Sequence, residues 1–207
     1  MKILVVGGGA REHSLVKKLS GEPSIERVVC APGNAGIERE NLTDLIPLDI
    51  SDSEAILSVA ETEDIDLTVV GPELPLANGV SDLFRNHGRF LFGPTKSAAR
   101  LESSKAFAKL FMARHAIPTA GFEVCESYEQ ALGLIRNDRF GPSVVIKADG
   151  LAAGKGVTVA EERTTAELAI RDAMIERRFG DAGTHLVLEE CLTGPEVSYF
   201  VITDGTK

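Results

Sequence analysis

The run from Lys147 to Gly156, KADGLAAGKG, brings together three glycines and two lysines. An apolar, β-branched segment precedes it at 144–146 and another follows at 157–159, so the pattern predicts a β-hairpin with a glycine-rich tip. Glycine lets backbone N–H groups approach an anion closely, and lysine adds a positive charge suited to phosphate. We therefore expect this tip to fold over a polyphosphate.

The run differs from a Walker A phosphate loop, in which four residues separate the first glycine from Gly-Lys-Ser/Thr and a helix follows. Here three residues separate Gly150 from Gly154, Gly156 stands in place of Ser or Thr, and a predicted strand follows. Taken alone, the run is equally compatible with an exposed, flexible hairpin that carries ordinary surface lysines. The other motifs of the chain favour the phosphate interpretation.

Glycines also follow the first predicted strand. The apolar segment 2–6 is followed by GGGAREH at 7–13 and then by a helical pattern through Leu19. This order of strand, glycine turn and helix opens a doubly wound α/β domain and presents a helix N-terminus suited to an anion. The NAD fingerprint needs a glycine where Glu12 stands, and an acidic residue after the second strand, where the chain has Pro32-Gly33-Asn34. We therefore expect a smaller phosphate-bearing ligand, or none.

Strands and helices alternate as far as Gly93-Pro94, with Ser51 or Asp52 capping the second helix. We expect strands at 2–6, 27–31, 44–48, 66–70 and 89–92, and helices through Leu19 and at 53–61 and 76–86. Ligands of such sheets bind at the carboxyl ends of the strands. Three turns fall there and predict one shared crevice, although each is also compatible with a simple strand–helix turn: Gly7–Gly9, Pro32–Asn34 and Gly71–Glu73.

From Thr95 onwards the pattern changes to helices followed by a second set of strands. We expect helices at 96–101, 104–115, 128–136 and 164–178, and strands at 122–124, 144–146, 157–159, 186–190 and 197–203. Ser103 is placed to cap the second of these helices, and Arg177 and Arg178 suit the C-terminus of the last one. An Asp204-Gly205 hairpin signal has no partner strand after it.

Composition narrows the classes of function. The 207 residues carry a net charge of −9 with 43% hydrophobic residues, which allows a sizeable core and argues against a nucleic-acid surface. Three widely spaced cysteines without metal-ligand spacing favour reduced, buried thiols in a cytoplasmic protein. No apolar run reaches the length of a membrane span. We expect a cytoplasmic protein without nucleic-acid or membrane partners.

Four runs now stand in order: GGGAREH at 7–13, GPE at 71–73, KADGLAAGKG at 147–156 and EECLTGPE at 189–196. Together they resemble the phosphoribosylamine–glycine ligases, also called glycinamide ribonucleotide synthetases, which are ATP-grasp enzymes of purine biosynthesis. The resemblance covers the whole chain, and the run at 147–156 is close to diagnostic. The chain corresponds to about the first half of a typical member, so we expect it to be truncated and inactive alone.

The resemblance implies an α/β fold: a Rossmann-like doubly wound domain at 1–102, then the first part of an ATP-grasp α+β domain at 103–207, with the lid subdomain at about 120–188. It implies that ATP, with Mg²⁺ or Mn²⁺, activates glycine as glycyl phosphate. The amine of 5-phosphoribosylamine then displaces phosphate, giving glycinamide ribonucleotide, ADP and phosphate. A monomer that binds these three small molecules is expected.

The resemblance also assigns residues. No catalytic residue is assigned, and the metal ligands are expected beyond Lys207. The residues expected at ATP are Lys105, Lys147, Gly150, Gly154, Lys155, Gly156, Glu189, Glu190, Leu192 and Glu196. The candidates for phosphoribosylamine are Gly8, Gly9, Arg11, Glu12, Gly71, Pro72 and Glu73. Taken alone, Lys105 and the pair Glu189-Glu190 are also compatible with exposed surface charges.

Two alternatives remain open. The first is another ATP-grasp carboxylate–amine ligase that uses a different acid. The second is a non-catalytic nucleotide-binding fragment, because a chain without the metal carboxylates lacks the cation that neutralises charge during phosphoryl transfer. Glycine-dependent ADP release would exclude the second.

Overall fold

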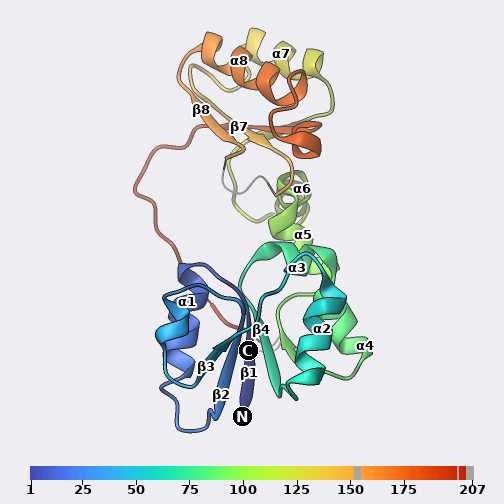
Figure 1. Cartoon of the computed structure of the whole chain (residues 1–207). Coiled ribbons are helices and arrows are strands. Elements are labelled where there is room, and N and C mark those ends of the chain that lie inside the picture. Colours follow the sequence, from blue (N-terminus) through green and yellow to red (C-terminus); the bar gives the residue numbers. More distant parts are fainter. Residues whose placement is uncertain (152–154, 200, 204–207) are drawn as a thin grey trace.

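The computed structural model describes residues 1–151, 155–199 and 201–203, and its helices and strands gather around two sheets (Figure 1). The first sheet is parallel, with the strand order β3-β2-β1-β4-β5. Its strands are β1 (Lys2–Gly7), β2 (Arg27–Pro32), β3 (Thr43–Leu45), β4 (Leu67–Val70) and β5 (Leu91–Phe92). From β1 the chain adds β2 and β3 on one side, and it then crosses to add β4 and β5 on the other side. The turns after β1 and β4 therefore lie at the switch point of the sheet.

Helices cover both faces of this sheet, which explains why its central strands are continuous apolar runs. One face packs against α1 (Ala10–Leu19) and the short η1 (Ile37–Arg39), around Val16 and Ile37. The other face packs against α2 (Ser53–Thr62) and α4 (Val80–Asn86). Asp52, and not Ser51, caps α2 by accepting the Ala55 N–H at 3.0 Å. The predicted doubly wound domain is confirmed.

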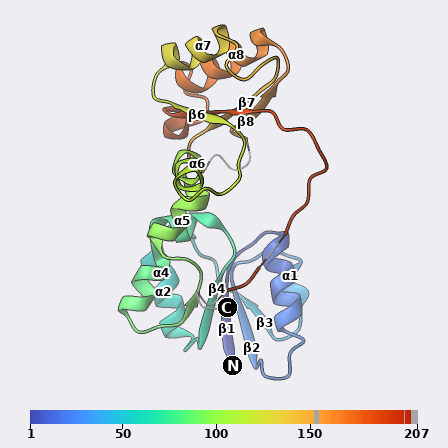
Figure 2. The same ribbon diagram turned by 180° about the vertical axis from the view of Figure 1, so that it is seen from behind.

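Two helices, α5 (Lys96–Ser103) and α6 (Lys105–Arg114), lead from the first sheet to the second (Figure 2). The second sheet is antiparallel, with the order β6-β9-β7-β8. Its strands are β6 (Phe122–Cys125), β7 (Val144–Ala148), β8 (Val157–Ala160) and β9 (Leu186–Glu190). One face carries α7 (Tyr128–Arg136) and α8 (Arg163–Met174), and the short η2 (Gly180–Gly183) precedes β9. The predicted β7–β8 hairpin is confirmed.

Several predicted boundaries are wrong for local reasons. The helix expected at 76–86 is two helices, α3 (Glu73–Asn78) and α4, because Gly79 adopts a left-handed φ of 100° that ends α3. The cap of α6 is Ser104 instead of Ser103, since the Ser104 hydroxyl accepts the Phe107 N–H at 3.1 Å. Helix α8 ends at Met174, before Arg177, whose φ of 49° is left-handed.

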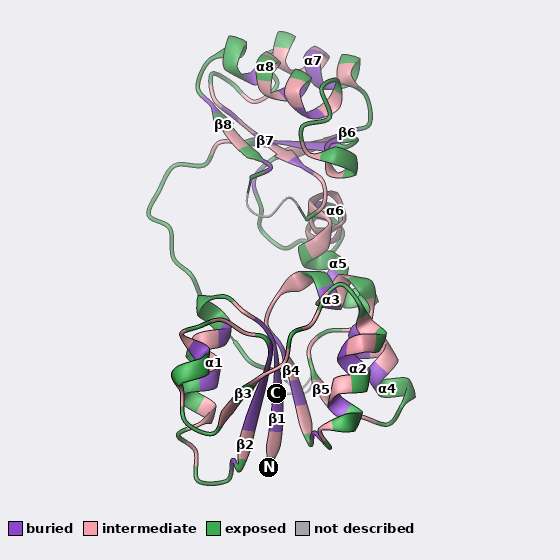
Figure 3. Cartoon of the chain, viewed as in Figure 1, coloured by how far each residue is buried: buried purple, intermediate pink, exposed green. Residues whose placement is uncertain are grey.

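The strand predicted at 197–203 is also wrong. Residues 197–199 and 201–203 are exposed and belong to neither of the two described sheets (Figure 3), and residue 200 lies outside the described residues. Strand β3 ends at Leu45 and does not reach residue 48. The Asp204-Gly205 signal lies outside the described residues. A search of the described helices finds none with the length and apolar character needed to cross a membrane.

Candidate functional site

A cavity of about 650 Å³ is lined by residues of the turn after β4, of α5 and α6 and of the second sheet. The lining residues are Pro72, Glu73, Leu74, Leu101, Glu102, Lys105, Ala108, Lys109, Met112, Lys147, Gly150, Leu151 and Glu189. Its volume suits a nucleotide-sized ligand.

Strand pairing brings Lys147 and Glu189 together on the cavity side of the second sheet. In the β7–β9 ladder Lys147 lies opposite Val187, so Glu189 is its diagonal neighbour on the same face. The Lys147 Nζ donates to Glu189 Oε2 at 2.9 Å and lies equally close to Oε1. The Glu189 side chain is only 5% exposed, whereas that of Lys147 is 27% exposed. Of the pair, Lys147 is the group that a ligand reaches more easily.

A second lysine, Lys109, contacts the same carboxylate and was not predicted as a site residue. Its Nζ lies 2.9 Å from Glu189 Oε2 and donates to Thr119 Oγ1 at 2.7 Å. The apolar pattern of α6 predicts that residues such as Leu110 are buried. In the structure Lys109 is the buried residue of this helix, and Leu110 is half exposed. The available signal was spacing, since Lys109 follows Lys105 by one helical turn and shares its face.

The start of the glycine run is attached to the N-terminus of α6. Lys105 Nζ donates to the Gly150 carbonyl at 2.9 Å. The Asp149 carboxylate accepts the Ser104 hydroxyl at 3.0 Å and the Ala106 N–H at 3.1 Å. These contacts place a carboxylate at a helix N-terminus, where it satisfies a free N–H and the helix dipole favours negative charge. They fix the root of the run beside the cavity.

In the first domain, Glu12 is a buried residue around which the glycine turns close. Its Oε2 accepts the Gly9 N–H at 2.6 Å. A Cβ on Gly71 would lie 2.0 Å from Glu12 Oε1, and a Cβ on Gly7 would lie 2.7 Å from Glu12 Cγ. Glycines at these positions therefore make room for the carboxylate. This explains how Glu12 can occupy the place of the third glycine in a dinucleotide fingerprint.

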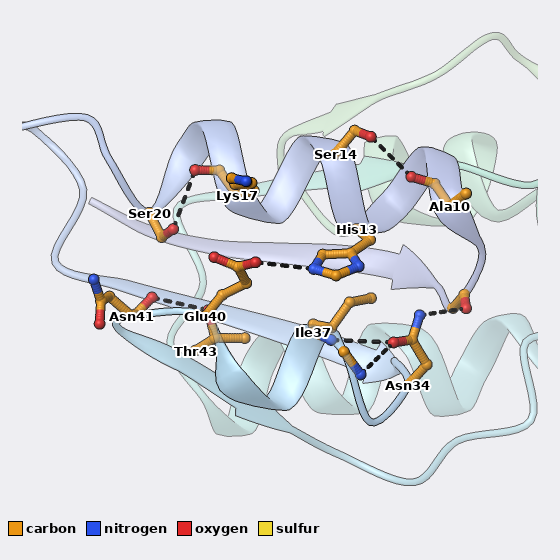
Figure 4. Close-up of polar contacts among 12 residues, drawn as sticks. Ala10, His13, Ser14, Lys17, Ser20, Asn34, Ile37, Glu40, Asn41 and Thr43 are labelled. Carbon is orange, nitrogen blue, oxygen red and sulfur yellow. Dashed lines mark hydrogen bonds and ion pairs between the residues drawn. The ribbon is translucent and has the colours of Figure 1, made fainter.

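Hydrogen bonds join the turns at the carboxyl ends of β1, β2 and β4. Arg11 Nη1 donates to the Gly71 carbonyl at 2.7 Å and lies 3.1 Å from Glu73 Oε1. The Asn34 side-chain amide donates to the Gly8 carbonyl at 2.8 Å (Figure 4). The three turns therefore meet at one edge of the sheet, as predicted. Figure 4 also shows His13 on Glu40, 2.9 Å apart, which anchors α1 to the segment after η1.

Only some of the predicted ATP residues line the cavity. The cavity wall contains Lys105, Lys147, Gly150 and Glu189, together with Pro72 and Glu73 from the substrate candidates. Gly156 is buried in the hairpin, where its carbonyl accepts the Ala148 N–H at 2.8 Å. Gly154 lies outside the described residues. The remaining predicted ATP residues are exposed and do not line the cavity: Lys155, Glu190, Leu192 and Glu196.

A doubly wound domain followed by an antiparallel sheet, with lysines from β7 and α6 lining one cavity, is the arrangement of the ATP-grasp class of nucleotide-binding proteins. Two family descriptions match the sequence: "Phosphoribosylglycinamide synthetase, N domain" over residues 1–102 and "Phosphoribosylglycinamide synthetase, ATP-grasp (A) domain" over residues 103–207. The chain belongs to the phosphoribosylglycinamide synthetase family.

Individual relatives agree with this assignment. The chain is 50% identical over 205 residues to a phosphoribosylamine–glycine ligase of Escherichia coli, and 48% identical over 206 residues to that of Xylella fastidiosa. These alignments cover 99% and 100% of this chain and 47% of each relative, so the chain spans about half of their length. The crystal structure of the Thermotoga maritima phosphoribosylamine–glycine ligase matches with a TM-score of 0.74 at 30% identity, over 94% of this chain and 45% of that chain.

A more distant structure shares the fold alone. The biotin carboxylase domain of the Hydrogenobacter thermophilus 2-oxoglutarate carboxylase, solved with MgADP, matches with a TM-score of 0.69 at 21% identity. The match covers 92% of this chain and 44% of that chain. The arrangement of the two sheets therefore extends beyond the phosphoribosylglycinamide synthetase family.

Proposed function

We propose that this chain provides the nucleotide site of an enzyme that uses ATP to join glycine to 5-phosphoribosylamine, giving glycinamide ribonucleotide, ADP and phosphate. Membership of the phosphoribosylglycinamide synthetase family supports the reaction. The observation that carries the proposal is the cavity into which Lys105, Lys147 and Gly150 all face. Two ammonium groups beside a glycine-rich turn are suited to a polyphosphate.

The proposed chemistry activates a carboxylate that is otherwise a poor acyl donor. The glycine carboxylate attacks the γ-phosphorus of ATP, giving glycyl phosphate and ADP. The amine of phosphoribosylamine then attacks the acyl carbon and phosphate leaves. The chain contributes positive charge at the phosphates through Lys105 and Lys147, and the hairpin limits the access of water to the acyl phosphate.

The turns around Glu12 and Arg11 are proposed to face phosphoribosylamine. Their position at the switch point of a parallel sheet supports this, because ligands of such sheets bind there. Arg11 offers a planar guanidinium suited to the ribose 5-phosphate, although it is engaged with Gly71 and Glu73 in the free chain. Glu12 acts on the substrate indirectly, by holding the turns closed around its carboxylate.

The divalent cation that accompanies ATP, Mg²⁺ or Mn²⁺, is assigned no protein ligand. Among the described residues, no group of three or more His, Cys, Asp or Glu side chains could hold a metal ion. When bound, such a cation neutralises charge on the phosphates. That the protein is a monomer, and that it is located in the cytoplasm, stay predictions from the sequence.

Thermal unfolding with ATP and with NAD tests the nucleotide site. ATP at one hundred times its dissociation constant should stabilise the chain by about 2.7 kcal/mol, which raises the melting temperature by about 5–10 °C. NAD should leave it unchanged. Lys147→Ala should cut the shift to about half or less, whereas the exposed Lys17→Ala should retain it. A shift with NAD alone would overturn the proposal, and glycine-dependent ADP release would show that the chain carries the whole reaction.

A further inference from the structure

Lys109 is a buried ammonium group to which the proposed reaction assigns no role. Its side chain is 9% exposed, and among the described residues it has three neighbours suited to a cation. These are Glu189 Oε2 at 2.9 Å, Thr119 Oγ1 at 2.7 Å and the Phe122 ring, whose centroid lies 5.7 Å from Nζ. Burying a charge is costly unless it is paired, so a lysine held this way in the cavity wall requires a reason.

The reason lies in the number of charges around Glu189. Two ammonium groups, those of Lys109 and Lys147, share one carboxylate, so the cluster carries a net charge of +1 where a simple ion pair carries none. The two lysines are not equivalent. Lys109 contacts the three groups named above, and its side chain is 9% exposed. The side chain of Lys147 is 27% exposed.

We propose that Lys109 is a positioning residue that releases Lys147 to the nucleotide phosphates by remaining as the partner of Glu189. When Lys147 turns from Glu189 to a phosphate, the buried carboxylate keeps the ammonium group of Lys109. Without Lys109, the same movement would leave Glu189 buried and unpaired, so Lys147 would be held in a neutral pair. This inference rests on the proposed nucleotide site and identifies what keeps one of its cations available.

Isothermal titration of the chain with ATP and with adenosine tests this role. Lys109→Met should raise the dissociation constant for ATP about tenfold, the loss of one charge-assisted contact. Adenosine has no phosphate, so its affinity should change less than twofold. Adding Glu189→Gln to Lys109→Met removes the carboxylate that retains Lys147 and should restore the ratio of the ATP affinity to the adenosine affinity, in which any contact of Glu189 with the nucleoside cancels. Lys17→Met, which removes an exposed lysine on α1, is the matched control and should bind as the unmutated chain does.

The outcomes separate this inference from the proposed function. Failure of the unmutated chain to bind ATP overturns both. An unchanged affinity for ATP in Lys109→Met overturns the role of Lys109 alone. A fall in the ratio of ATP to adenosine affinity that Glu189→Gln does not restore means that Lys109 only packs the wall, and also overturns it. If Lys109→Met does not fold, the double variant decides, because it has no unpaired buried carboxylate. A ratio of ATP to adenosine affinity within twofold of that of the unmutated chain supports the inference, and a tenfold lower ratio overturns it.

Discussion

At the scale of single residues, Glu12 places a buried carboxylate where nucleotide-binding turns commonly have a glycine. A glycine at its position would let α1 approach the sheet closely. Here a buried carboxylate fills that space, and Gly7 and Gly71 accommodate it because they have no Cβ. The sequence showed that Glu12 replaces a glycine, but the reason for Gly71 became clear only when the two were seen in contact.

The first prediction concerns this contact. Gly71→Ala would place a methyl group 2.0 Å from Glu12 Oε1, so the free energy of unfolding should fall by about 1–3 kcal/mol in urea titrations. The matched control is Gly133→Ala in α7, where a Cβ meets nothing within 4 Å. It should raise stability by up to about 1 kcal/mol through helix propensity. In a Glu12→Ala background, Gly71→Ala should cost much less; an equal cost there would contradict the explanation.

The second prediction concerns alkaline pH. Burial raises the pKa of the Cys30 thiol to about 12 from an ordinary value of 9.0, and the charge of Glu12 adds to the effect. The unfolded thiol therefore loses its proton first. Below pH 9 this thiol leaves the free energy of unfolding constant; from pH 9 to 12 it lowers that energy by about 1.4 kcal/mol per pH unit.

Urea unfolding between pH 8 and 11 checks this behaviour. Cys30→Ala removes the titrating group, so its free energy of unfolding should fall less steeply with pH than that of the unmutated chain. The same slope in both would show that Cys30 contributes nothing to the pH dependence.

At the scale of elements, α6 links the glycine run to the cavity. Its first turn presents Lys105 to Gly150 and binds the Asp149 carboxylate, while its next turn carries Lys109 to Glu189. One helix therefore aligns two lysines with strands β7 and β9. Helical spacing in the sequence predicted the helix, but its apolar residues gave no indication that the buried face carries charge.

The third prediction separates capping from nucleotide binding. Asp149→Ala removes the carboxylate that accepts the Ala106 N–H in the first turn of α6, so the free energy of unfolding should fall by about 1 kcal/mol, as it does when a helix N-terminal N–H loses its side-chain partner. The substitution should also weaken ATP binding, because the root of the glycine run is released. Asp52→Ala removes a carboxylate that serves α2 in a similar way, by accepting the Ala55 N–H. It should lose similar stability in thermal unfolding without a change in ATP affinity. Equal ATP affinities in both variants would contradict the link between cap and loop.

At the scale of the whole molecule, the buried residues form clusters that belong to one sheet or the other. Two clusters lie on the faces of the first sheet and one lies beneath α7 and α8. Among the described helices and strands, the more extensive contacts that link the two parts involve the connecting helices α5 and α6. We therefore expect the two parts to unfold separately.

The fourth prediction uses a matched pair of core substitutions. Ile56 and Ile170 are both fully buried, one in each part. Each Ile→Val substitution should cost about 0.5–1.5 kcal/mol. Calorimetry should show two transitions, with Ile56→Val lowering one and Ile170→Val lowering the other. A single transition that both variants shift equally would show that the two parts unfold as one unit.

The sequence by itself determined most of the element order and the residues that announce phosphate chemistry. Apolar periodicity and turn residues act over a few positions, so β1, α7 and β9 were predicted almost to the residue. Lys147 was found for the same reason, since it belongs to a recognisable local motif, whereas Lys105 was assigned only by the family resemblance.

Only the tertiary structure decided which distant groups meet. Lys109 and Glu189, or Glu12 and Gly71, are far apart in the chain, and no local pattern links them. Residues 197–199 and 201–203 have apolar strand character in the sequence, yet they belong to neither of the two described sheets, because a strand forms only where the fold brings another strand beside it. Local propensity therefore specified the pieces, while burial and charge pairing across the two sheets specified the site.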